Sequence, residues 1–223
     1  MRTSQIGLVS GGLDGDLSGK SDRFSRHSGY LGRIGLAPGE DVAVDDEPPD
    51  LDDMELEGLA LTGERVVGLE LERASITGAN IDGCDLSGVV LSSYAVRRSK
   101  VMRTRLRDCI LAGGIVQDAE IAECPSERLS FRFSTLQRVT FTDCQLPGAD
   151  FYGAVFDKVT FTRCDLSGAH FDSATVKELV LQSCTLLGVT GALSLRGAVV
   201  DLDDLPGLAP SLAREAGLKF SVE

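Results

Sequence analysis

The sequence predicts an all-β solenoid whose coils have four sides and which ends in a short α-helical cap. Three observations lead to this fold. An apolar residue recurs at every fifth position, small residues and glycines keep fixed places around it, and similar residues return every 20 positions. The 223 residues suffice for a sizeable core. No run reaches the roughly 18 apolar residues of a membrane helix, so we expect no membrane-spanning segment.

The five-residue period runs from Leu56 to Leu186, where 26 of 27 fifth positions are apolar. The residue two places before each apolar centre is usually small, and glycine recurs two places after it. Neither a helix, with its period of 3.6, nor a continuous strand, with its period of 2, fits this pattern. Short extended pieces separated by corners fit it, because the centre and the small residue then point inward and glycine takes the corner. Ser126, the polar centre, predicts a local distortion such as a bulge.

The cysteines indicate how many sides one coil has. Cys84, Cys124, Cys144, Cys164 and Cys184 are separated by multiples of 20 residues, which is four pentads. The 27 pentads therefore make nearly seven coils, a rod of roughly 30–35 Å at about 4.8 Å per coil. We expect the thiols to stack side by side in the wall of the core as small hydrophobic groups.

Several pentads share the pattern Ala/Cys-Asp/Asn-Leu/Phe-Ser/Thr-Gly or a close variant of it, among them 79–83, 84–88 and 164–168. This pattern resembles the pentapeptide-repeat family over about residues 54–200. The resemblance implies a right-handed quadrilateral β-helix over residues 51–200. It also implies an alternative function, because some relatives imitate a DNA duplex and protect DNA gyrase from quinolones.

Residues 1–50 differ in composition from the repeats. They hold nine glycines and six serines and end in an acidic, proline-bearing run. This composition predicts a flexible or disordered N-terminal tail. The alternative is a small cap in which Tyr30, Leu31, Ile34 and Leu36 cover the first coil.

Residues 201–223 predict a helical cap. Acidic residues and Pro206 favour a helix start, and Pro210 either splits the helix in two or kinks it. The segment is similar to that of a mycobacterial fluoroquinolone-resistance member of the family, which implies end-to-end dimerisation; a monomer with a self-sufficient cap is the alternative. The candidate cap or dimer residues, at helical spacing, are Leu205, Leu208, Leu212 and Ala216.

A group of basic residues interrupts a chain whose net charge is −12. Six cations fall within 11 residues, at outward positions on three successive sides of the coil. We call them the basic belt and interpret them either as a solvated face or as a partner-binding surface. The basic belt comprises Arg97, Arg98, Lys100, Arg103, Arg105 and Arg107.

Catalytic chemistry finds little support in the sequence. His27 and His170, the two histidines, do not make a metal site, and no hydrolase or metalloprotease motif occurs. The segment 14–21 departs from a phosphate-binding loop at Asp14, and no βαβ unit follows it. We therefore expect no enzyme and no cofactor.

The sequence favours a non-catalytic scaffold, a rigid rod that binds a protein partner. The alternative is a DNA mimic that binds DNA gyrase and confers quinolone protection. Residues 51–200 hold 20 acids and 15 bases, a weak excess for a DNA mimic. The acidity disfavours direct nucleic-acid binding, and the unpaired cysteine spacing and missing secretory signal favour the cytoplasm.

Overall fold

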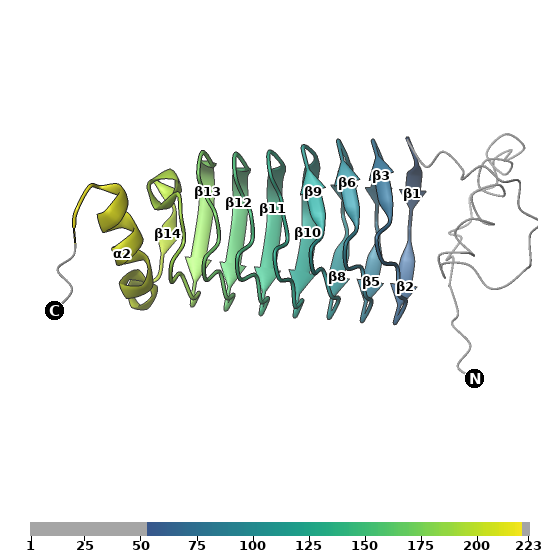
Figure 1. The fold of residues 1–223 in the computed structure, drawn as a ribbon. Coiled ribbons are helices and arrows are strands. Elements are labelled where there is room, and N and C mark those ends of the chain that lie inside the picture. The colour runs from purple at the N-terminus through teal and green to yellow at the C-terminus, as the bar shows by residue number, and fades with distance from the viewer. Residues whose placement is uncertain (1–52, 220–223) are drawn as a thin grey trace, which may run out of the picture.

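The chain folds into a rod of stacked coils with a helix across its C-terminal end (Figure 1). The structure is a computed structural model that describes residues 53–219. The predicted tail of residues 1–50 lies outside the described residues, and the domain boundaries at residues 50 and 200 stay predictions. The strands are β1 Glu55–Glu57, β2 Ala60–Thr62, β3 Glu70–Glu72, β4 Ser75–Thr77, β5 Asn80–Asp82, β6 Val90–Ser92, β7 Ala95–Arg97, β8 Lys100–Met102, β9 Ile110–Ala112, β10 Ile115–Ala122, β11 Thr135–Thr142, β12 Val155–Thr162, β13 Thr175–Gln182 and β14 Val199–Val200.

The strands pair in parallel, and from β1 to β12 each residue lies opposite the one 20 positions later. Glu55 pairs with Ser75 and Val116 with Leu136. One side of the rod is the series β1-β4-β7-β10-β11-β12-β13, seven coils in the described part of the chain. The second side holds β2, β5 and β8, which join β10, and the fourth holds β3, β6 and β9. Isolated bridges such as Arg65 to Asp85 make the third side. The predicted four-sided solenoid is confirmed.

The corners between sides have a left-handed backbone. Gly58 has φ 65°, as the glycine pattern predicts. Sixteen described residues other than glycine also have positive φ, among them Asp118 at 54° and Arg138 at 52°. Side chains with a Cβ take this conformation at a cost of roughly 1–2 kcal/mol each. The fold therefore imposes the corner, and glycine is only its least strained occupant.

The core changes character along the rod. The C-terminal coils are filled by six phenylalanine rings, at most 1% exposed, whereas the N-terminal coils hold leucine, isoleucine and valine at the same kinds of positions. Phe151 stacks on Phe131 and Phe171, with ring centroids 5.8 and 5.2 Å apart. The buried rings are Phe131, Phe141, Phe151, Phe156, Phe161 and Phe171.

Tyr94 departs from the rule that small residues precede each centre. Its ring lies over Gly114, where a Cβ would come within 2.3 Å of the ring. Its hydroxyl donates to Ser134 Oγ, two coils further on, at 3.2 Å. A large side chain fits here because the residue above it has none.

The structure corrects the expectation about Ser126. Its backbone keeps the register, since its N–H donates to the Gln145 carbonyl at 2.8 Å and Pro125 bridges to Gln145. The serine hydroxyl is instead buried without a hydrogen-bond partner. The irregularity lies elsewhere, between β12 and β13, where Asp157 pairs with Glu178.

The C-terminal end of the rod is closed by α2 (Leu205–Glu215), preceded by two 3₁₀ turns at Ala192–Leu195 and Leu202–Asp204. Of the two outcomes expected at Pro210, the split into two helices is wrong, because α2 continues through Pro210. Carboxylates satisfy backbone N–H groups of the last coil, which would otherwise form an open sheet edge. Asp204 accepts from Cys184 N at 2.7 Å, and Glu215 accepts from Ala192 N and Leu193 N at 2.9 Å.

Candidate functional site

The basic belt is largely neutralised by acids on neighbouring coils. Lys100 pairs with Glu120 at 2.7 Å, and Arg105 with Asp85 at 3.3 Å. Arg103 pairs with Asp82, and Arg107 lies 3.5 Å from Asp108 and 3.6 Å from Glu127. Within residues 53–219, Arg97 and Arg98 form no ion pair. The belt's role in partner binding stays a prediction.

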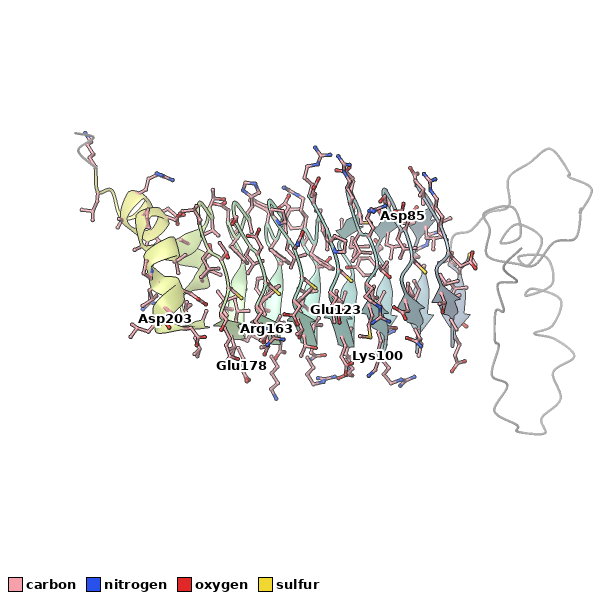
Figure 2. The ribbon with its side chains drawn as sticks, turned by 90° about the horizontal axis from the view of Figure 1, so that it is seen from below. Asp85, Lys100, Glu123, Arg163, Glu178 and Asp203 are labelled. Atoms are coloured by element: carbon pink, nitrogen blue, oxygen red, sulfur yellow. The ribbon has the colours of Figure 1, made fainter. Side chains whose placement is uncertain are left out.

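Further ion pairs join corner residues of consecutive coils. Arg128 donates to Asp108 at 2.6 Å and Arg163 to Asp143 at 2.7 Å, each across 20 residues. These hydrogen bonds hold the pKa values of the two aspartates below their ordinary range. Charges of both signs therefore lie along the rod: Figure 2 shows Lys100, Glu123, Arg163 and Glu178 following one another in that order.

A cluster that the sequence reasoning missed lies on the fourth side. The aromatic patch, as we call it, consists of Arg132, Phe133 and Tyr152. The two rings meet edge to face, with centroids 5.4 Å apart. The Arg132 guanidinium lies 4.6 Å from the Tyr152 ring centre and 5.5 Å from that of Phe133, and pairs with Asp150 at 2.8 Å. The patch is an amphipathic surface held in place by cation–π contacts.

Phe133 is an unusual corner residue. It is 60% exposed and has φ 56°, whereas Gly113 and Gly153 take the same corner one coil before and after it. Gly153 makes room for the ring, because a Cβ there would lie 2.7 Å from Phe133 Cδ1. The signal was present in the sequence as the one aromatic residue at a corner position of the repeats.

A polar group adjoins the patch on the next coils. The Thr190 hydroxyl donates to Asp172 Oδ2 at 2.6 Å and lies 2.9 Å from His170 Nδ1. His170 bridges to Asp150, so this group continues the side that bears the patch. The hydroxyl stands between the acid and the imidazole, so the aspartate does not orient the histidine as a nucleophile's base requires.

The cysteines lie in the core wall, as predicted. All six are free and buried. Burial raises the pKa of Cys109 to about 11, and a hydrogen bond with Cys124 raises that of Cys144 to about 12. Thiols with such pKa values are poor nucleophiles and poor metal ligands at neutral pH. Within the described residues no group of three or more potential ligands is placed to hold a metal ion.

The predicted cap residues divide into two roles. Leu208 is buried and Leu212 packs partly buried against the core. Leu205 is 38% exposed and Ala216 is exposed. The large exposed apolar side chains of this end of the rod are Leu187, Leu193, Val199, Leu202, Leu205 and Leu218.

Comparisons with known proteins agree with the repeat pattern. The family model "Pentapeptide repeats (8 copies)" matches residues 56–92, and the model "Pentapeptide repeat region" matches residues 99–171. A search of curated proteins found no match. No helix within residues 53–219 is long and apolar enough to cross a membrane.

Three solved structures are similar to the chain. A pentapeptide repeat protein from the Arabidopsis thaliana thylakoid lumen is 26% identical over 37% of this chain and 55% of its own, with a TM-score of 0.32. Rfr23 from the cyanobacterium Cyanothece 51142 is 17% identical over 67% of this chain and 90% of its own, with a TM-score of 0.33. QnrB1, a plasmid-mediated fluoroquinolone resistance protein, is 18% identical over 74% of this chain and 99% of its own, with a TM-score of 0.28.

Proposed function

The repeat region of this chain belongs to the pentapeptide-repeat family, and on that premise we propose that the chain is a rigid, non-catalytic scaffold that binds a protein partner. The aromatic patch is the observation that carries the proposal. Tyrosine and arginine are enriched among the residues that dominate the energy of protein interfaces. In the patch, Tyr152 and Arg132 stand beside an exposed phenylalanine on a stiff surface.

Phe133 supports a binding role because the fold gains little from it. The ring is 60% exposed and contributes no core packing, while its backbone takes a conformation that bulky residues avoid. Glycine makes the same corner on both neighbouring coils. An exposed aromatic residue that the corner does not require is typical of a contact surface.

The test uses Phe133→Gly, which restores the corner residue of the neighbouring coils and keeps the fold. Full-length wild type, this variant and the control Lys158→Gly, a change at an exposed corner outside both the patch and the basic belt, are immobilised, and proteins captured from the source cell are quantified by mass spectrometry. We expect one or more partners to bind wild type and the control, and to be lost with Phe133→Gly. Capture of the same set by all three chains would refute the patch as the contact surface.

The basic belt is a second candidate contact surface, and Arg97 and Arg98 are its candidate contact residues. Their guanidinium groups have no ion-pair partner among residues 53–219, unlike the other four cations. Reversing both charges with glutamate should weaken binding of an acidic partner. Unchanged capture by the double variant would exclude the belt.

The alternative function, DNA mimicry directed at DNA gyrase, has weaker support. The proposal draws on the family and on the fluoroquinolone resistance named for QnrB1. The surface charges oppose it, because cations such as Arg128 and Arg163 neutralise acids on successive coils. A supercoiling assay with purified gyrase, with and without a quinolone, tests it: no inhibition and no protection at micromolar chain would reject it.

We further propose a homodimer joined through the C-terminal end. Six large apolar side chains are exposed there, and Leu202 is the most exposed at 79%. Burying such side chains against a second copy removes apolar surface from water. Light scattering should give a dimer mass for wild type and a monomer mass for Leu202→Asp with Leu205→Asp. A monomeric wild type would refute the dimer.

The proposal includes a cytoplasmic location and no cofactor. Six free, buried thiols suit a reducing compartment, where cysteines persist unpaired. The Thr190 hydroxyl donates its hydrogen bond to Asp172, which supports a structural role for the polar group around Thr190.

A further inference from the structure

Inward side chains of the N-terminal coils line a cavity of about 160 Å³. Its lining begins at Met54 in the first described coil and ends at Phe131 in the fourth. Three coil steps of about 4.8 Å give it a length of about 15 Å along the rod axis. A volume of this size spread over that length describes a slender channel between the four walls.

The cavity exists because the inward side chains of these coils are too small to meet. Leu71, Leu91 and Leu111 occupy the column that continues as Phe131 and the other stacked rings. The ring column is at most 1% exposed, whereas Leu71 and Leu91 are 6% and 7% exposed. Three further inward positions on the other sides hold only valine: Val96, Val101 and Val116.

The lining is apolar and its polar groups are already satisfied. Ser99 donates its hydroxyl to the Arg97 carbonyl at 2.9 Å and accepts from Ala79 N at 3.1 Å. The Cys109 thiol donates to the Leu86 carbonyl at 3.0 Å. A water inside would therefore lack the two to four partners that hold buried water. Apolar cavities of about 150 Å³ in proteins stay dry and bind benzene or xenon.

We propose that this cavity is a binding site for a slender, unbranched hydrocarbon chain. The apolar walls supply dispersion contacts and no hydrogen bonds, so they select against polar ligands. The narrow cross-section set by four facing walls selects against branched ones. This site lies inside the core, apart from the surface patch, so the proposal does not depend on the proposed function.

The test uses the full chain and two saturated hydrocarbons, n-hexane and the branched isooctane, at saturation in buffer. A ligand that binds only the folded state raises the thermal midpoint. We expect n-hexane to raise the midpoint of wild type and isooctane to leave it unchanged. Absence of a shift with n-hexane, or equal shifts with both, would overturn the proposal.

Two variants locate the site. Leu91→Phe and Leu111→Phe extend the ring column into the cavity and should abolish the n-hexane shift. Leu166→Val, in the filled half, lowers stability without touching the cavity and should keep the shift. Retention of the shift by both phenylalanine variants would place the ligand elsewhere and overturn the proposal.

A second readout decides the matter if the phenylalanine variants do not fold. Methyl resonances of wild type are compared with and without n-hexane. Perturbations confined to lining methyl groups such as those of Leu71, Leu91 and Val101 would support the site. Unperturbed lining methyl groups would refute it.

Discussion

The two halves of the rod follow the same repeat but fill it differently. In the C-terminal coils, strands of eight residues, β11 to β13, span two sides, and stacked phenylalanine rings leave almost no internal surface; β10, also of eight residues, lies at the boundary and its Val116 lines the cavity. In the N-terminal coils, strands of three residues surround an aliphatic core with a cavity of about 160 Å³. Both halves keep the 20-residue register. The backbone register is thus set by the corners and small residues, whereas packing density depends on the volume of the centres.

The largest expected change in stability comes from removing a phenylalanine ring from the C-terminal half of the core. Phe151 contacts four other rings, so Phe151→Ala removes a central piece of close packing. We expect it to lower the free energy of unfolding by about 4 kcal/mol, against about 2 kcal/mol for Leu91→Ala beside the existing cavity. Urea unfolding followed by circular dichroism measures both. Equal losses of unfolding free energy in the two variants would contradict the proposed difference in packing between the halves.

A leucine-to-phenylalanine substitution should change the free energy of unfolding in opposite directions in the two halves. Leu111→Phe places a ring in the cavity directly before Phe131 and should raise the free energy of unfolding by about 1 kcal/mol. Leu166→Phe adds the same atoms where no space exists and should lower it by about 1–3 kcal/mol. The same urea unfolding experiment tests the pair. A destabilised Leu111→Phe protein that still folds natively would argue that the cavity is not fillable.

Ser126 lies where the two halves meet and offers a smaller test. Its hydroxyl is buried at 1% exposure without a partner. Ser126→Ala removes that polar group and should raise the free energy of unfolding by about 1 kcal/mol. Thermal unfolding checks it. A loss of stability would show that the hydroxyl has a partner, such as a bound water.

The smallest effect concerns alkaline pH. Burial raises the pKa of Cys109, beside the cavity, from 9.0 to about 11. Because the fold disfavours the thiolate, the contribution of this group is complete below pH 9 and is lost as the pH rises through 11. We expect stability to fall above pH 9 and Cys109→Ala to flatten part of that fall. An identical alkaline profile in the variant would contradict the assignment.

Much of the fold follows from the sequence because it depends on local pattern. The five-residue period and the spacing of the cysteines predict four sides, parallel stacking and the buried thiols. The 20-residue spacing also accounts for ion pairs between coils, since Lys100 and Glu120 are 20 residues apart and pair with each other. Corner residues were less predictable, because the fold imposes positive φ on residues such as Arg138 that rarely adopt it alone.

The other features could not be predicted from one column of the repeat, because each depends on side chains from several sides or coils. The cavity arises only where leucine and valine face each other from all four walls, and no single column reveals it. Tyr94 is accommodated by Gly114 in the next coil, and neither residue by itself predicts this pairing. The aromatic patch combines side chains of adjacent coils, Phe133 and Tyr152. In the cap, α2 tolerates Pro210, and its packing rather than its helical spacing separates buried Leu208 from exposed Leu205.

The N-terminal coils line an apolar cavity, whereas stacked rings fill the C-terminal coils. Crystals of the full chain exposed to pressurised xenon test this most directly, because xenon enters dry apolar cavities without requiring hydrogen bonds. Xenon is expected among Leu71, Leu91 and Leu111, and none among the rings from Phe141 to Phe171. A core without xenon in the N-terminal coils, or with xenon only among the rings, would contradict it.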